Sequence, residues 1–188
     1  MRFNTRFVRS SKIKILHWMI TIVCVYLAVS VRLLNLPLLD WKYVTETDAA
    51  RYLRQAKLID KVGHVPAVDS MRYHPTGWKS EKEPTLVSHF IFICYKIAKL
   101  FHSDLSIEAV GILYPPICFG IGLIVFYLLG SRLLSGNVAL ISVVLLALSP
   151  GALDRTVAGF TDKDGLTWLL GLLLYYFYVR AYQTESGA

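Results

Sequence analysis

Two aspartates, Asp162 and Asp164, alternate in a short polar segment between two long apolar runs of the sequence. A carboxylate beside a membrane segment has to be paired, bound to a metal or turned toward water, because hydrocarbon does not solvate it. Alternating carboxylates supply the oxygen ligands that hard divalent cations prefer. Glycines Gly151, Gly159 and Gly165 would let the backbone turn tightly and approach a ligand. The pattern allows a metal site, and it equally allows a solvated loop.

The apolar runs around this segment are typical of a helical membrane protein. Of the 188 residues, 55% are hydrophobic, and the mean hydropathy of +0.49 exceeds that of a soluble domain of average composition. The net charge of +7 comes from scattered cations whose densest group lies beside the first apolar run. That placement indicates membrane topology or anionic lipid and argues against nucleic acid. The cysteines Cys24, Cys94 and Cys118 lie within apolar runs and predict neither a disulfide nor a zinc site.

We therefore predict an all-α polytopic membrane protein with four transmembrane helices and a long outer loop that carries amphipathic surface helices. A basic, acid-free tail at 1–14 places the N-terminus in the cytoplasm, and the run after it is too long for a signal peptide. The expected segments are a first span at 15–34, an outer loop at 35–106, a second span at 107–130, a third at 133–150, an outer acidic loop at 151–165, a fourth span at 166–180 and a cytoplasmic end at 181–188. The Pro115–Pro116 pair predicts a kink in the second span.

Two stretches of the outer loop decide where the acidic residues lie. Residues 45–61 contain good helix formers, and Thr47 or Asp48 could cap the helix at its N-terminus, where the helix dipole favours an ionised carboxylate. Residues 87–102 are apolar but too short to cross about 30 Å of hydrocarbon, so we predict an amphipathic helix along the outer surface. With that assignment, Asp48, Asp162 and Asp164 fall on the same side of the membrane.

The order of these features resembles a known family. An acidic residue that heads a surface helix after the first span is shared by many C-type membrane glycosyltransferases. The stretch RTVAGFTDKDGL, residues 155–166, resembles the second acidic motif of the catalytic subunit of oligosaccharyltransferase, the enzyme of protein N-glycosylation. Further elements resemble this family in the same order: Arg32-Leu33, the first acidic motif from Asp48 to Arg54, and the loop at 66–78 with Tyr73, Pro75 and Gly77. The family has aromatic residues after the first aspartate, where this chain has Ala49 and Ala50.

The resemblance implies transfer of an oligosaccharide from a polyprenyl (pyro)phosphate donor to the Asn of an acceptor protein with an Asn-x-Ser/Thr sequence. It implies that Asp48 and Asp162 are catalytic, that Asp48, Asp162 and Asp164 bind Mn²⁺ or Mg²⁺, and that Asp164 is a further ligand or binds the donor side. Arg155 would contact phosphate or pair with an acid. The expected location is a membrane, the plasma membrane in a prokaryote, with the acidic motifs on the outer face. Because the family continues through further spans and a soluble domain with a Trp-Trp-Asp motif, we expect this chain to be an N-terminal part that lacks the C-terminal region.

Two other functions compete with this one. A different polyprenyl-dependent transferase, such as a protein O-mannosyltransferase, usually has adjacent Asp and Glu residues in its first motif, whereas Glu46 and Asp48 are not adjacent. A non-catalytic membrane protein would use the acids as helix caps and as ion pairs with Arg155 or Lys163. Metal binding would distinguish that class from both enzymes. The five histidines are scattered, and we expect none of them to be a ligand.

Overall fold

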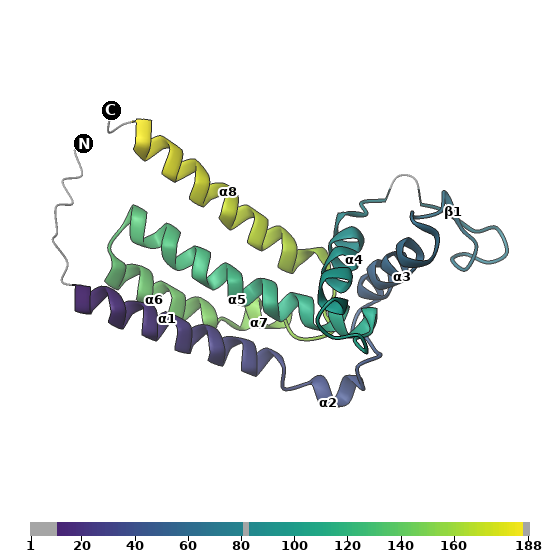
Figure 1. The fold of residues 1–188 in the computed structure, drawn as a ribbon, viewed down its shortest axis with the longest axis horizontal. Helices are drawn as coiled ribbons and strands as arrows, with labels where there is room; N and C mark the ends of the chain where they lie inside the picture. Colours follow the sequence, from purple (N-terminus) through teal and green to yellow (C-terminus); the bar gives the residue numbers. More distant parts are fainter. Residues whose placement is uncertain (1–10, 81–82, 186–188) are drawn as a thin grey trace.

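The computed structural model describes residues 11–80 and 83–185, and most of them are helical (Figure 1). The N-terminal half contains α1 (Ser11–Arg32), α2 (Leu36–Leu39), α3 (Thr47–Val62), the strands β1 (Val68–Asp69) and β2 (Trp78–Lys79), and α4 (Leu86–Lys99). The C-terminal half contains α5 (Ile107–Leu133), α6 (Gly136–Ala147), α7 (Pro150–Asp154) and α8 (Lys163–Glu185). Most of the predicted basic tail lies outside the described residues, and its last residues are the first turn of α1.

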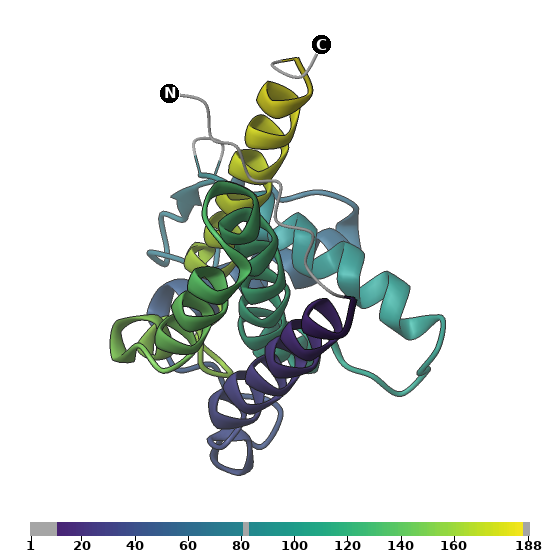
Figure 2. The same cartoon turned by 90° about the vertical axis from the view of Figure 1, so that its left-hand side faces the viewer.

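Helices α1, α5, α6 and α8 form a bundle, and α5 packs against the other three (Figures 1 and 2). Helices α3 and α4 and the β1–β2 pair lie together at one end of this bundle (Figure 1). Helix α4 lies across that end and not along the bundle, and its position on a membrane surface remains a prediction. The elements outside the bundle are therefore gathered at one of its ends.

Two helical segments of the described chain are long and apolar enough to cross a membrane. They are Ile13–Leu39 and Ile107–Leu133, each of 27 residues, where about 20 suffice. Helix α6 has only 12 residues, so the third span predicted at 133–150 is shorter than expected. Helix α6 ends before Pro150 because proline cannot continue the helix, and Pro150 instead lies in the first turn of α7. Helix α8 has 23 residues and extends beyond the predicted 166–180 at both ends. Four spans remain a prediction.

Three local predictions need correction. Glu46, and neither Thr47 nor Asp48, caps α3: its Oε2 accepts a hydrogen bond from the Ala49 N–H at 3.1 Å. The outer loop also contains the short antiparallel β1–β2 pair, which an all-α assignment omits. The acidic loop predicted at 151–165 contains α7 and the first residues of α8, so Asp164 lies in a helix.

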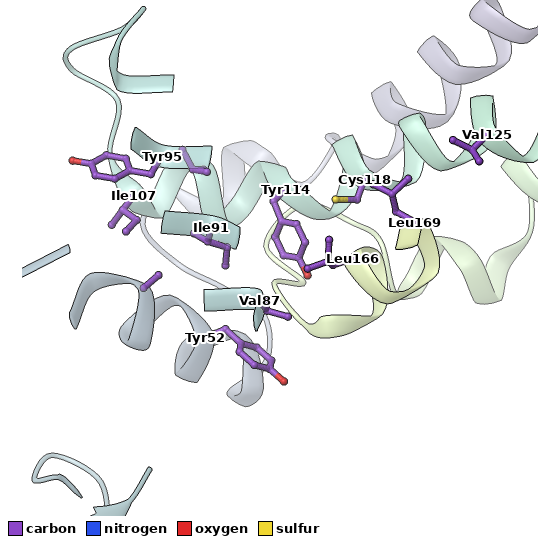
Figure 3. Packing of buried hydrophobic residues seen from close by; sticks show 12 residues of the cluster. Tyr52, Val87, Ile91, Tyr95, Ile107, Tyr114, Cys118, Val125, Leu166 and Leu169 are labelled. Atoms are coloured by element: carbon purple, nitrogen blue, oxygen red, sulfur yellow. The ribbon is translucent and has the colours of Figure 1, made fainter. Parts of the chain in front are cut away.

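A cluster of buried side chains joins α3 and α4 to the bundle (Figure 3). Tyr52 of α3 and Ile91 of α4 belong to it, with Tyr114 of α5 and Leu166 of α8. Full burial of one such apolar side chain contributes about 1.5–3 kcal/mol. The cluster therefore fixes α3 against the start of α8, which are the two elements that carry the acidic motifs.

Candidate functional site

Arg32, the last residue of α1, ties the first helix to the segment that follows α6. Its side chain is fully buried, and its Nε donates to Thr156 Oγ1 at 2.6 Å. Its Nη1 donates to the carbonyl oxygens of Ala28 at 3.0 Å and Ala147 at 3.4 Å. The guanidinium also lies 3.6 Å from the centroid of the Phe119 ring, a cation–π contact. These contacts solvate a buried charge and fix the start of the acidic segment.

The acidic segment at 155–162 is irregular, yet hydrogen bonds to α1, α5 and the turn after α1 hold it in place. Those bonds are Ala158 N to Arg32 O (2.9 Å), Gly159 N to Ile112 O (3.0 Å), Asn35 Nδ2 to Ala158 O (2.8 Å) and Thr161 Oγ1 to Gly111 O (2.7 Å). Buried loop backbone needs such partners, because each unpaired group costs free energy. The segment is therefore a fixed platform for the carboxylate that follows it.

Asp162 is buried at the end of this platform, directly before α8, with 6% of its surface exposed. The Tyr114 hydroxyl of α5 donates to the Asp162 carbonyl oxygen, and Oδ2 lies 3.6 Å from Lys163 Nζ. Oδ1 is buried and has no hydrogen-bond partner. Because nearly all buried polar atoms in proteins are paired, this oxygen is suited to a cation or to a donor from a ligand.

Asp164 has a different environment because the Asp-x-Asp sequence crosses the start of a helix. Its Oδ2 lies 3.6 Å from Arg155 Nη1, and the two side chains are 38% and 62% exposed. Exposed pairs of this kind contribute about 0–1 kcal/mol. Both ion pairs expected of a non-catalytic protein, Arg155 with Asp164 and Lys163 with Asp162, are thus present, and of the two roles expected for Arg155 the structure has the acid pair.

Asp48 lies in the first turn of α3, and because Glu46 caps the helix, the Asp48 carboxylate is not used as the cap. Its side chain is 49% exposed, and Oδ1 lies 3.4 Å from Arg51 Nη2. Asp48 is thus a charged group at the surface of the same end of the bundle.

The structure brings the two acidic segments together. The Thr45 N–H donates to the Gly159 carbonyl oxygen at 3.1 Å, and each of these residues is three positions before an aspartate, Asp48 and Asp162 respectively. The starts of α3 and α8 lie at the same end of the bundle (Figure 1). A single site that uses both aspartates is therefore sterically reasonable.

The pKa of Tyr52 is affected by the charges of both Asp48 and Asp162. Burial raises the pKa of this phenol, the positive charge of Arg51 opposes the rise, and the negative charges of Asp162 and Asp48 add to it. The ring is 1% exposed and lies in the cluster that joins α3 to α8 (Figure 3). Tyr52 is therefore a buried, neutral phenol that is affected by the charges of both carboxylates.

The residues present fit a divalent cation in part. Within residues 11–80 and 83–185, no group of three or more His, Cys, Asp and Glu side chains is arranged to hold a metal ion, so the three aspartates do not form a ready-made cage. The buried Asp162 Oδ1 without a partner is nevertheless the kind of oxygen that Mn²⁺ and Mg²⁺ bind. The roles assigned to Asp48, Asp162 and Asp164 remain predictions.

Comparison with known proteins decides the family. A family model described as "Oligosaccharyl transferase STT3, N-terminal" matches residues 15–188. The chain belongs to the STT3 family. The resemblance inferred from the sequence motifs is thereby confirmed, and the family is one of glycosyltransferases.

This STT3 chain has relatives in plants and a structural match in an archaeon. It is 28% identical over 96 residues to a dolichyl-diphosphooligosaccharide–protein glycosyltransferase subunit STT3B of Oryza sativa subsp. japonica, which covers 51% of this chain and 13% of the relative. It is 33% identical over 82 residues to the STT3B subunit of Arabidopsis thaliana, which covers 44% of this chain and 11% of the relative. Its structure matches that of the archaeal oligosaccharyltransferase AglB from Archaeoglobus fulgidus, solved in complex with an inhibitory peptide and a dolichol-phosphate, with a TM-score of 0.70.

The AglB match has 22% sequence identity and covers 93% of this chain and 20% of AglB, so it shows the fold. Together with the two apolar helices, the family and the fold make this STT3 chain an integral membrane protein. The chain spans only 11–20% of the length of these three proteins.

Several residues that build the site escaped the sequence-based prediction. Tyr52 and Tyr114 were not singled out from the sequence, although a tyrosine in an otherwise apolar helix usually needs a partner for its hydroxyl, which is a usable signal. The pairing of Arg54 with Asp69 has no local signal: Nε and Nη2 donate to the two carboxylate oxygens at 2.7 and 2.6 Å across 15 residues. This fork joins α3 to β1.

Proposed function

We propose that this chain forms part of the active site of an enzyme that transfers an oligosaccharide from a polyprenyl (pyro)phosphate donor to an Asn of an acceptor protein with the Asn-x-Ser/Thr sequence. The reaction depends on Mn²⁺ or Mg²⁺, and it takes place on the outer face of the membrane. Membership of the STT3 family and the glycosyltransferase subunits among its relatives support this reaction.

The single observation that carries the proposal is the buried carboxylate of Asp162. One of its oxygens has no partner, on a platform that a hydrogen bond joins to the segment of Asp48. A buried charge is costly unless it is paired, so an arrangement with an unpaired oxygen favours a bound cation. The competing, non-catalytic function explains the ion pairs of Lys163 and Arg155, but it does not explain why Asp162 Oδ1 is buried without a partner.

The chain's own residues would contribute to the reaction in three ways. Asp48 and Asp162 would hold the cation, which stabilises the negative charge that develops on the leaving diphosphate. Asp48, which is more exposed, would also accept the N–H of the acceptor amide and take up its proton. The amide nitrogen forms its bond to the anomeric carbon as the bond from that carbon to the diphosphate oxygen breaks. Asp164, in the first turn of α8, would lie on the donor side.

The test is glycan transfer to an Asn-x-Ser/Thr peptide by the protein at its native length, with Mn²⁺ added or chelated. We expect Asp48→Ala and Asp162→Ala each to abolish transfer, because loss of charge stabilisation in the transition state removes several kcal/mol. Folding should change little for Asp48, since an exposed negative charge in the first turn contributes only about 0.3–1 kcal/mol through the helix dipole.

Asp162→Asn is the matched variant for the buried position, because it keeps the shape and removes the charge. A retained thermal midpoint with lost transfer would separate catalysis from packing. Transfer at the normal rate in Asp48→Ala, or activity that is indifferent to the chelator, would contradict the proposal and leave these acids as helix and ion-pair residues.

A further inference from the structure

Arg51 lies one turn after Asp48 on α3 and faces two carboxylates. Its Nη2 is 3.4 Å from Asp48 Oδ1, and its Nη1 is 3.7 Å from Glu83 Oε1. The Arg51 side chain is only 18% exposed. A largely buried positive charge of the chain therefore lies beside one oxygen of Asp48.

This guanidinium is held loosely for a largely buried group. Both of its distances exceed the 2.7–3.2 Å usual for an N–H···O hydrogen bond, and its Nε is buried without a partner. The contact that orients it is with the Tyr52 ring, whose centroid is 4.4 Å from Cζ. A buried guanidinium normally satisfies its donors, so Arg51 is placed between two acceptors and bound tightly by neither.

Glu83 is the fixed member of this trio. Its Oε1 accepts from Trp78 Nε1 at 2.8 Å, its Oε2 accepts from Gln55 Nε2 at 2.9 Å, and Arg72 Nη1 lies 2.8 Å from both oxygens. Burial alone would raise the pKa of Glu83, but the hydrogen bonds from Arg72 and Trp78 and the charges of Arg72 and Arg51 lower it overall. Glu83 is thus a stationary negative charge that attracts Arg51 away from Asp48.

We propose that Arg51 is the internal counter-cation of Asp48, which a divalent cation has to displace, and that Glu83 holds Arg51 as it leaves. This inference rests on the proposed function, because it requires Asp48 to be a metal ligand. Two cations cannot occupy the same carboxylate edge without strong repulsion, so binding of the metal and pairing with Arg51 exclude each other. Arg51 and Glu83 are then positioning residues that set how much cation the site needs.

Mn²⁺ affinity, measured by the loss of the free-ion electron paramagnetic resonance signal, tests this directly in the protein at its native length. Arg51→Gln should tighten Mn²⁺ binding about two- to fivefold, the range expected for removal of a partly exposed ion pair. Glu83→Gln should weaken it, because Arg51 then pairs with Asp48 alone. In the Arg51→Gln background, Glu83→Gln should have no further effect on affinity, since its action passes through Arg51.

Lys57→Gln is the matched control for charge. Lys57 lies on the same helix and pairs with Glu108 at 2.6 Å, so its loss removes one positive charge without touching Asp48. If Arg51→Gln binds Mn²⁺ no more tightly than Lys57→Gln, the inference is overturned. This comparison also decides the matter if Glu83→Gln does not fold.

Asp48→Ala separates failure of the inference from failure of the proposed function. If it abolishes Mn²⁺ binding while Arg51→Gln leaves the affinity unchanged, Asp48 is a ligand and only the counter-cation role fails. If Mn²⁺ binds equally well to Asp48→Ala, the metal site itself is elsewhere, and both ideas are overturned.

Discussion

Replacement of Gly159 by alanine should loosen the connection between the two acidic segments. Gly159 has φ +84°, a left-handed conformation that costs an L-residue roughly 1–2 kcal/mol. A Cβ at this position would lie 2.8 Å from Leu39 Cδ1 and 3.4 Å from Thr45 Cγ2. Crowding of this kind costs typically about 1–3 kcal/mol, so the variant should lose about 2–5 kcal/mol in total.

The position is sensitive because both backbone groups of Gly159 are in use. Its N–H donates to the Ile112 carbonyl oxygen at 3.0 Å, and its carbonyl oxygen accepts from the Thr45 N–H at 3.1 Å. A shift of the residue 159 backbone away from Leu39 would lengthen at least one of these hydrogen bonds. We therefore expect Gly159→Ala to lower glycan transfer as well as stability, because the platform of Asp162 would move relative to α3.

Gly151→Ala is the control for this experiment. Gly151 lies in α7, no atom is within 4 Å of its hypothetical Cβ, and alanine is favoured over glycine in a helix by roughly 0.5–1 kcal/mol. Thermal or denaturant unfolding in detergent, with transfer measured on the same samples, compares the two variants. Equal stabilities of Gly159→Ala and Gly151→Ala would refute the reasoning.

Three further predictions concern charge and topology. The Arg54 hydrogen bond lowers the pKa of Asp69 despite burial, so its contribution to stability should be present above the ordinary value of 3.8 and lost as the pH falls below it; thermal midpoints should show this dependence, and Asp69→Asn should remove it. In a cysteine-free background, a cysteine at the exposed position of Arg155 should react with an impermeant maleimide from outside, whereas one at Ser135 should react only after permeabilisation; the reverse would contradict the proposed outer face. Asp164→Ala should reduce transfer less than loss of the buried aspartate two residues earlier, because its side chain is 38% exposed and paired in a weak ion pair; equal losses would assign it an equal share of the cation.

The helical fold could be predicted because its signals are local. The apolar runs that became α1 and α5 are long enough to recognise without any tertiary information, and the first turn of α3 follows a polar cap. The cap itself was misassigned: Thr47 and Asp48 have suitable side chains, but the chain turns one residue earlier, at Glu46. Helix boundaries depend on small differences in free energy, which a sequence pattern does not resolve.

The acids of the candidate site were singled out from the sequence, but their surroundings were not. Asp162 was singled out because acidic residues beside apolar runs are unusual, and Asp48 because it stands at the start of a helix. The Thr45–Gly159 hydrogen bond joins their segments, and the roles of both acids remain predictions. The contact of Arg51 with Glu83 spans 32 positions, and no periodicity in the sequence indicates it. Partners that are distant in the sequence are chosen by packing, so they appear only when the chain is folded.

The buried position of Arg32 has a consequence for the biosynthesis of the protein. The guanidinium ends the first long apolar helix, yet its acceptors at Ala147 and Thr156 are 115 and 124 residues further along the chain. While the ribosome is still producing the intervening residues, the guanidinium has the Ala28 carbonyl oxygen and later the Phe119 ring as partners but lacks these two acceptors, and an incompletely paired charge in the bilayer is costly. We therefore expect α1 to remain shallow, with Arg32 in the aqueous interface, until the residues around Thr156 are made. Helix α1 would then reach its final depth in the membrane only after the acidic segment at 155–162 has been synthesised.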